Sequence, residues 1–318
     1  MQDVLHSAGV QAGHILDLWR LMLGVCAVVF AAVLLAFLWA VLRAPRAGRD
    51  TSPDLSALQH NEPRLLRRVA WATALSTLLL FGLVGASVWT DRALAQLPLH
   101  GALHVRVTAH QWWWDLQYDD AEPSRIFTTA NELHVPVGRP VILTLLSDDV
   151  IHSFWVPSLA GKKDLIPGRT AQLQFRADRA GTYRGQCAEF CGAQHARMAF
   201  RVIAEEPAAY EAWAARQRQP AAPPADALRQ RCQQLFLAGT CVMCHNVGGT
   251  DATGRRAPDL THLGSRQTLA AGTLPNAPEP LAAWIRDPQS HKPGTNMPGH
   301  DYSPEDMQAL VAWLRGLE

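Results

Sequence analysis

The chain has 318 residues, 29 Lys and Arg against 28 Asp and Glu, and a formal net charge of +1. This length accommodates two ordinary domains of roughly 100–150 residues with further segments beside them. A protein that binds nucleic acid usually carries a clustered basic stripe, whereas the basic residues here are spread along the chain. We therefore expect a multidomain protein that does not bind nucleic acid.

Two long apolar runs stand near the N-terminus, Leu21–Leu42 and Val69–Thr90, and neither contains a charged residue. Each is long enough for a helix to cross an apolar layer of about 30 Å. Tryptophans, which commonly anchor such helices at the membrane surface, stand near the run ends: Trp19, Trp39, Trp71 and Trp89. A buried hairpin of a soluble protein is the alternative, but the pattern favours two transmembrane helices, about 16–42 and 68–91, within an anchor at 1–95.

Arginines mark the side on which the loop between these helices lies. The loop region carries Arg43, Arg46, Arg49, Arg64, Arg67 and Arg68, whereas no Lys or Arg precedes Arg20. The positive-inside rule then places the loop in the cytoplasm and both termini outside. Cysteines after the second helix would lie in an oxidising compartment, where idle thiols form disulfides.

Residues 96–206 change to short alternating stretches separated by Gly and Pro turns, a pattern typical of an antiparallel β-sandwich or barrel. Residues 207–225 follow as a short helix and a Pro/Ala linker. Residues 226–318 carry helical runs at about 227–239 and 304–317 between Gly/Pro-rich loops, which predicts an all-α domain.

The densest chemical motif is Cys187-Ala-Glu-Phe-Cys191-Gly-Ala-Gln-His195-Ala-Arg-Met198. Its thiols, imidazole and thioether are soft or intermediate ligands, which suit copper better than calcium or magnesium. Two thiolates four residues apart can bridge two metal ions, with His195 and Met198 capping them. A disulfide between the two cysteines is the alternative, and it would be favoured if the histidine and methionine were absent.

A dinuclear site needs a second imidazole, and His152 in Asp149-Val-Ile-His152 is one source. A lone histidine at a strand end is often only a satisfied polar residue. Composition alone leaves three other histidines open as ligands: His104, His110 and His134.

The paired motifs resemble the dinuclear copper domain of cytochrome c oxidase subunit II, a cupredoxin-like β-barrel that follows two membrane helices. The resemblance covers about residues 15–205. It implies that Cys187 and Cys191 bridge the coppers and that the other ligands are His152, His195, Met198 as a weak ligand, and the backbone carbonyl of Glu189. It also implies that the Glu189 side chain points to a magnesium or manganese ion at the interface with subunit I, with Asp149 as the nearby acid.

Gln111-Trp112-Trp113-Trp114 resembles the aromatic stretch of the same family, which implies that Trp112 is where electrons enter. Packing in a core or at the membrane interface explains such aromatics equally well. One position departs from the family, because Arg67-Arg68-Val69-Ala70-Trp71 stands where a glutamate often feeds a proton channel. Glu62 lies earlier in the chain, and a solvated loop acid is the simpler interpretation of it.

Cys241-Val-Met-Cys244-His245 is the attachment signature of a c-type haem, with two thiols for thioether bonds and an imidazole for the iron. Zinc binding or thiol redox chemistry are alternatives, but no second pair of metal ligands follows and no βαβ context surrounds the motif. The signature predicts a covalently bound haem c.

The second axial ligand must come from farther along the chain. Met297, in a Pro/Gly loop, is the candidate, whereas Met243 and Met307 are expected to pack or face solvent. His/Met ligation suits electron transfer. Residues 226–318 resemble a class I cytochrome c, which implies that the Pro258 carbonyl accepts a hydrogen bond from His245. Cys232 lies outside this pattern and is expected to be a free thiol packed against its helix.

Together these resemblances imply subunit II of a respiratory cytochrome c oxidase in a bacterial plasma membrane, with its soluble domains on the periplasmic side. Electrons would pass from haem c to copper and on to subunit I, where oxygen is reduced to water with proton translocation. Expected partners are subunits I and III and an electron-donating cytochrome or bc-type complex. The alternatives are a free-standing membrane-anchored electron carrier, a quinol oxidase subunit and a copper-delivery protein.

Overall fold

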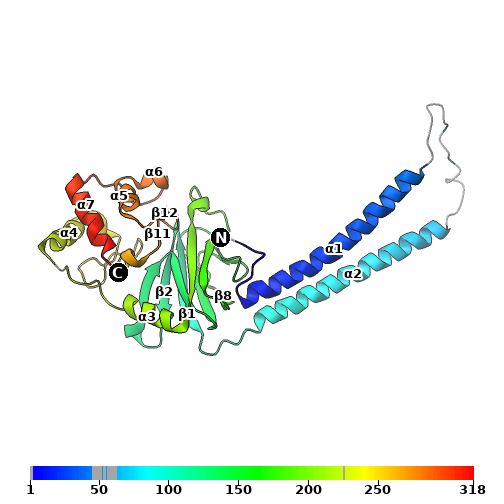
Figure 1. Cartoon of the computed structure of the whole chain (residues 1–318), viewed down its shortest axis with the longest axis horizontal. Helices are drawn as coiled ribbons and strands as arrows, with labels where there is room; N and C mark the ends of the chain where they lie inside the picture. The colour runs from blue at the N-terminus through cyan, green and yellow to red at the C-terminus, as the bar shows by residue number, and fades with distance from the viewer. Residues whose placement is uncertain (1–2, 45–51, 53–54, 56–62, 225) are drawn as a thin grey trace. The chain divides into compact units, whose positions relative to one another are not determined.

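The computed structural model describes residues 3–44, 52, 55, 63–224 and 226–318 (Figure 1). The chain divides into two compact units, one of Met1–Gly13 with Leu97–Glu318 and one of His14–Gln96. Three residues named above, Arg46, Arg49 and Glu62, lie outside the described residues, so their expected roles stay predictions.

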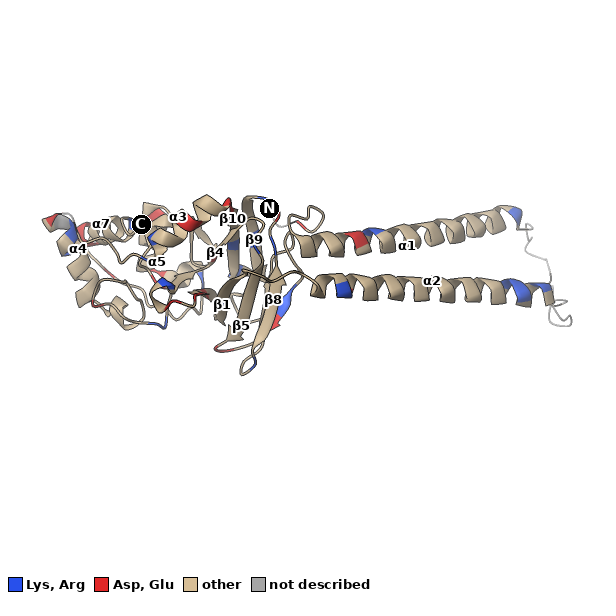
Figure 2. Cartoon of the chain, turned by 90° about the horizontal axis from the view of Figure 1, so that it is seen from below, with Lys and Arg blue, Asp and Glu red and all other residues tan. Residues whose placement is uncertain are grey.

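Two long helices make up the His14–Gln96 unit almost entirely: α1 (Val10–Arg43) and α2 (Pro63–Ala95). Both are long and apolar enough to cross a membrane, and their apolar windows bury no residue within the structure. Figure 2 shows that their charged residues gather toward the helix ends. Both helices extend beyond the predicted 16–42 and 68–91, because the apolar run measures the membrane layer and a helix can continue past it into polar surroundings.

Ten strands of the larger unit form two five-stranded sheets. The first has the order β3-β2-β1-β5-β8, with β1 Leu103–His110, β2 Trp113–Asp119, β3 Phe127–Ala130, β5 Val141–Ser147 and β8 Ala171–Phe175. The second has the order β4-β10-β9-β6-β7, with β4 Glu132–Pro136, β6 His152–Trp155, β7 Lys163–Leu165, β9 Gly181–Cys187 and β10 Ala199–Glu205.

The predicted purely antiparallel arrangement is wrong for two pairs of strands, because β1 runs parallel to β5 and β10 runs parallel to β4. The chain leaves the first sheet after β3, adds β4 to the second sheet and returns as β5. β1 and β5 are therefore joined through the opposite sheet and not by a hairpin, which permits parallel pairing.

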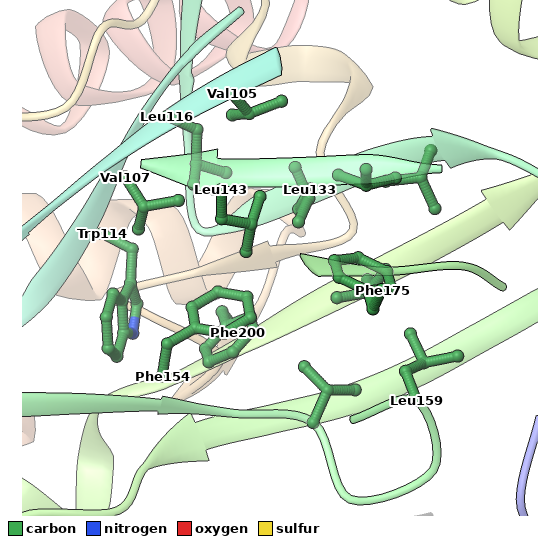
Figure 3. Close-up of a cluster of buried hydrophobic side chains, with 14 of the residues drawn as sticks. Val105, Val107, Trp114, Leu116, Leu133, Leu143, Phe154, Leu159, Phe175 and Phe200 are labelled. Atoms are coloured by element: carbon green, nitrogen blue, oxygen red, sulfur yellow. The ribbon is translucent and has the colours of Figure 1, made fainter. Parts of the chain in front are cut away.

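Large apolar side chains fill the space between the two sheets (Figure 3). Strand β1 alternates buried and more exposed residues, as a half-buried strand does. Trp114 is fully buried and meets Phe154 edge to face, with ring centroids 5.8 Å apart. The same indole lies edge-on to His152 at 6.2 Å, so the core supports one of the expected metal ligands directly.

The first residues of the chain pack on this β-domain. Gly9 forms a β-bridge with Ala177, and the Ala8 amide donates to the Ser158 carbonyl at 2.7 Å. A Cβ on Gly9 would lie 2.7 Å from the Arg176 carbonyl oxygen, so only glycine fits this close approach.

Helix α3 (Pro207–Gln217) follows the last strand and also belongs to the β-domain core. Trp213 stacks on His134 with ring centroids 4.0 Å apart. Beyond α3 the linker rests on the following domain, since the Ala221 amide donates to the Gly248 carbonyl at 2.9 Å.

The last domain is mainly helical, as predicted. Its elements are α4 Ala227–Ala238, α5 Pro278–Arg286, α6 Pro288–His291, α7 Pro304–Arg315 and the short strands β11 Thr268–Leu269 and β12 Leu274–Pro275. Phe236 of α4 meets Trp313 of α7, with ring centroids 5.2 Å apart. Cys232 is a buried free thiol within this core, as expected.

Candidate functional site

The end of the second sheet brings together the residues of the Cys/His/Met motif. Cys187 is the last residue of β9, where it pairs with Phe154 of β6, and its amide donates to the Met198 carbonyl at 2.9 Å. His152 begins β6. The loop that leaves β9 returns through a short 3-10 turn, His195–Arg197, to β10. Strands β9 and β10 therefore hold the two ends of the loop, and the neighbouring β6 carries His152.

The side chains from these positions converge. The Sγ atoms of Cys187 and Cys191 are 3.8 Å apart. Cys187 Sγ also lies 3.8 Å from His152 Nδ1 and 3.1 Å from the Glu189 carbonyl oxygen. One donor atom each of His152, Cys187 and Cys191 lie within 4.8 Å of one another, a spacing that a metal ion can fill.

The Cys191 thiol brings the remaining two expected ligands into the cluster. Cys191 Sγ lies 3.6 Å from His195 Nδ1 and 3.9 Å from Met198 Sδ. All six expected copper-binding positions thus face one small volume. The donors are thiols, imidazoles, a thioether and a carbonyl, a set that fits copper.

The alternative interpretations of these residues find no support in the geometry. A disulfide requires its sulfurs about 2.0 Å apart, and all six cysteines, which lie within the described residues, are free thiols. The other candidate histidines have different surroundings. His110 stacks on Trp113, His134 lies against Trp213 with its Nδ1 3.0 Å from Glu205, and His104 is exposed on β1.

The paired thiols shape each other's protonation. The hydrogen bond between the two thiols lowers the pKa of Cys187, and further hydrogen bonds with His152 and with the backbone of Glu189 and Ser153 lower it as well. The same hydrogen bond, together with burial and the charge of Cys187, raises the pKa of Cys191. One thiolate is therefore ready at neutral pH, whereas the second proton must be released as a cation binds.

Asp149 orients the His152 ring. Its Oδ1 lies 2.8 Å from His152 Nε2, which directs Nδ1 toward Cys187. Burial would raise the pKa of Asp149, but hydrogen bonds from His152 and from the amides of Val150 and Gln111 hold that pKa below its usual range. The carboxylate thus stays charged and fixes the imidazole.

Replacing Asp149 with alanine is expected to weaken copper binding roughly 10- to 100-fold, the usual cost of losing a group that orients a metal ligand. Asp148→Ala is the matched control, since this neighbour lies near His110 and is largely exposed. Competition with a copper chelator measures both variants. Equal affinities of the two would contradict the orienting role.

Trp112 lies between β1 and β2 and touches the metal loop. Its indole Nε1 donates to the Cys191 carbonyl at 2.9 Å, and the Gln111 side chain donates to the same oxygen at 2.7 Å. Gly192 has a φ of +106°, and a Cβ there would lie 3.2 Å from the indole. The left-handed glycine therefore lets Trp112 lie against the loop.

The Cys241–His245 motif occupies a 3-10 turn after α4. The His245 amide donates to the Cys241 carbonyl at 2.9 Å, which turns both cysteines and the histidine inward. His245 Nδ1 lies 2.7 Å from the Pro258 carbonyl oxygen, the contact that the resemblance implied. Burial lowers the pKa of His245, so the ring is neutral, with Nδ1–H donated and Nε2 free to bind a metal.

A cavity of about 340 Å³ opens beside this motif. Its lining includes Cys241, Cys244, His245 and Met297, together with apolar residues of α5 and α7. Both cysteines of the signature, its imidazole and the distant thioether thus face one apolar space, which fits a c-type haem with His/Met ligation.

The other two methionines are placed differently. Met307 is buried in the core of α7, as expected. Met243 is 71% exposed and lies at the rim of the cavity.

The cavity is closed on one side by the β-domain, where its lining includes Gln111, Trp112, Trp113 and Asn131. Trp112 therefore contacts the Cys/His/Met loop and also lines the cavity beside the Cys241–His245 motif. This arrangement could not be predicted from the sequence, because a Pro/Ala linker permits many positions of the last domain.

Asp115 of β2 lies where the two domains meet. Burial, with the nearby charge of Asp259, raises the pKa of Asp115 from 3.8 to about 6, although Arg266 opposes the shift. Between these two values the folded chain binds more protons than the unfolded chain, so its stability falls as the pH rises through this window. The loss is complete above about pH 6.

Replacing Asp115 with asparagine is expected to raise the free energy of unfolding by about 2 kcal/mol near pH 8, because the ionisation penalty disappears. The gain should vanish below about pH 4. Thermal unfolding of the full chain at both pH values measures it, with the exposed Asp251→Asn as control. A gain independent of pH would contradict the ionisation argument.

Comparisons with known proteins match both domains. Residues 121–205 match the family model of the cytochrome c oxidase subunit II periplasmic domain, and residues 230–318 match that of cytochrome c. The periplasmic domain of subunit II of a cytochrome oxidase from Bradyrhizobium japonicum is a similar solved structure, with 30% identity, 36% of this chain and 93% of that chain covered, and a TM-score of 0.35.

Two curated relatives are each named cytochrome c oxidase subunit 2. That of Alkalihalophilus pseudofirmus is 43% identical over 217 residues, which span 68% of this chain and 61% of the relative's length. That of Bacillus subtilis is 30% identical over 309 residues, covering 92% of this chain and 83% of the relative. Since the second alignment spans the membrane helices and both soluble domains, the chain belongs to the cytochrome c oxidase subunit 2 family.

Proposed function

We propose that the chain is the electron-entry subunit of a respiratory cytochrome c oxidase. Electrons would pass from a haem c in the last domain to a dinuclear copper centre in the β-domain and then to subunit I, where oxygen is reduced to water with proton translocation. The observation that carries this proposal is that Trp112 lies between the cavity of the haem signature and the six-donor cluster.

Cys187 and Cys191 would bridge two copper ions, with His152, His195, Met198 and the Glu189 carbonyl as the remaining ligands. Copper held there would supply a one-electron carrier. The chain's own contribution is rigidity. Strands β9 and β10 fix the ends of the loop and Asp149 fixes His152, so the ligands need not move when the charge of the site changes.

Cys241 and Cys244 would hold haem c through thioether bonds, with His245 and Met297 as axial ligands. Bound haem would supply a one-electron carrier of raised potential. The Pro258 carbonyl keeps His245 in the tautomer that can bind iron, and the apolar walls of the cavity keep water away.

The two long helices would anchor the chain in a bacterial plasma membrane and dock on subunit I, with both soluble domains on the outer side. The Glu189 side chain would face a magnesium or manganese ion shared with subunit I. Subunit III and a donor cytochrome or bc-type complex complete the expected partners. Oxygen reduction is assigned to subunit I, because the two apolar runs of this chain, Leu21–Leu42 and Val69–Thr90, contain no histidine that could bind a haem or copper within the membrane.

Stopped-flow reduction of the isolated complex tests the order of electron transfer. Haem c should be reduced first and copper second, with oxygen consumption following. In Cys191→Ser the haem should still be reduced while oxygen consumption stops. Isolation of the chain without a large haem-containing partner would instead support a free-standing electron carrier.

A further inference from the structure

The haem domain is attached to the β-domain by buried polar contacts at two separate places. At the first, the carboxylate of Glu132 at the start of β4 accepts the amides of Gln267 and Thr268 at 2.9 Å and the Thr268 hydroxyl at 3.0 Å. Only 2% of Glu132 is exposed. The donors all belong to the haem domain, so docking alone satisfies this carboxylate.

At the second place, Lys292 follows α6 and is 3% exposed. Its ammonium donates to the Trp112 carbonyl at 2.8 Å and to the Ala270 carbonyl at 3.2 Å. Among the described residues no carboxylate forms an ion pair with it. Burial lowers the pKa of Lys292 to about 7.

Around Lys292 the loops that carry the two cofactor sites touch directly. The Gln194 side chain donates to the Pro293 carbonyl at 2.8 Å, and Arg197 donates to the His291 carbonyl. Gly294 lies against Trp112, where an added Cβ would be 3.5 Å from the ring. The loop after α6 therefore reaches both the neighbours of His195 and the indole that contacts Cys191.

A transient encounter between tethered domains needs only exposed complementary charges, which stay hydrated and steer the approach. Here a carboxylate and an ammonium are both removed from water. Burying a charge is costly unless hydrogen bonds replace its hydration, and for Glu132 these come from the other domain. Such groups specify one docked arrangement.

We propose that Glu132 and Lys292 are positioning residues that hold the haem domain permanently on the β-domain, with Trp112 between the two cofactor sites. Electrons then cross within a fixed complex, and the haem domain does not search on its linker before each transfer. This inference rests on the function proposed above.

Hydrogen exchange of the intact complex tests docking without relying on activity. The amides of Gln267 and Thr268 should be protected, and Lys292→Met should raise their exchange about tenfold although Lys292 does not contact them, because losing a charged hydrogen bond weakens the whole interface. The exposed Lys162→Met is the matched control and should leave exchange unchanged.

Electron transfer provides the second readout. After flash reduction of haem c, copper reduction in the unaltered complex should be insensitive to added glycerol, whereas in the double variant Glu132→Ala/Lys292→Met it should slow about tenfold and follow solvent viscosity. A viscosity-dependent rate in the unaltered complex, or unchanged exchange in Lys292→Met, would overturn the inference. Absence of either cofactor signal would instead overturn the proposed function.

Discussion

Replacing Cys191 with serine is expected to abolish the copper centre and lower electron delivery to oxygen by more than about 100-fold. Losing a group that merely orients a ligand already costs 10- to 100-fold, and Cys191 is itself a proposed bridging ligand. Its sulfur is also the one that lies near both His195 and Met198. Copper content, electron paramagnetic resonance and oxygen consumption measure the loss.

The control for this substitution is Cys26→Ser, which removes an exposed thiol of α1. It should keep full copper content and activity. His152→Ala should give the same loss as Cys191→Ser, because the His152 ring is the imidazole ligand that lies beside Cys187. A variant of either residue that keeps two coppers and normal turnover would contradict the ligand assignment.

Replacing Met297 with alanine is expected to lower the reduction potential of haem c by on the order of 0.1–0.3 V, since axial ligands set haem potentials over a range of about 0.8 V and methionine raises them. Each 59 mV is a factor of ten in a one-electron equilibrium. Electron uptake from the donor should therefore become unfavourable by at least about tenfold. Redox titration of the haem absorbance measures the shift.

Two other methionines serve as controls. Met307→Leu changes a core residue of α7, and Met243→Leu changes an exposed residue at the cavity rim. Neither should alter the potential by a comparable amount. If Met243→Leu produced the large shift and Met297→Ala did not, the axial ligand would be misassigned.

Local motifs were the most predictable part of the molecule. The ligands from Cys187 to Met198 stand within a dozen residues, so their spacing alone indicates that they converge. The haem signature is equally local. Helices α4 and α7 were predicted to within two residues at each end, because their polar and apolar residues follow helical spacing.

Features that depend on distant contacts were missed. Helix α5 begins with two prolines among three residues in a Gly/Pro-rich region, which masks a short helix. The β-bridge joins Gly9 to Ala177, which is far away in the sequence, and no local pattern indicates it. The parallel pairs of strands arise in the same way, from the order in which the chain visits two sheets.

The residues that join the two soluble domains were also invisible in the sequence. Glu132 and Lys292 look like ordinary surface charges, since burial by another domain leaves no mark on the residues beside them. Trp112 was singled out by resemblance alone. The structure adds that Trp112 contacts Cys191 and Lys292, which could not be predicted from the sequence.

The most direct test of the account is paramagnetic resonance and optical spectroscopy of the complex that contains the full chain. We expect one low-spin haem c and one unpaired electron shared between two copper nuclei, with the copper signal lost in Cys191→Ser and the haem signal retained. A haem signal beside a single mononuclear copper, or with no copper, would contradict the account and leave a membrane-anchored cytochrome in its place.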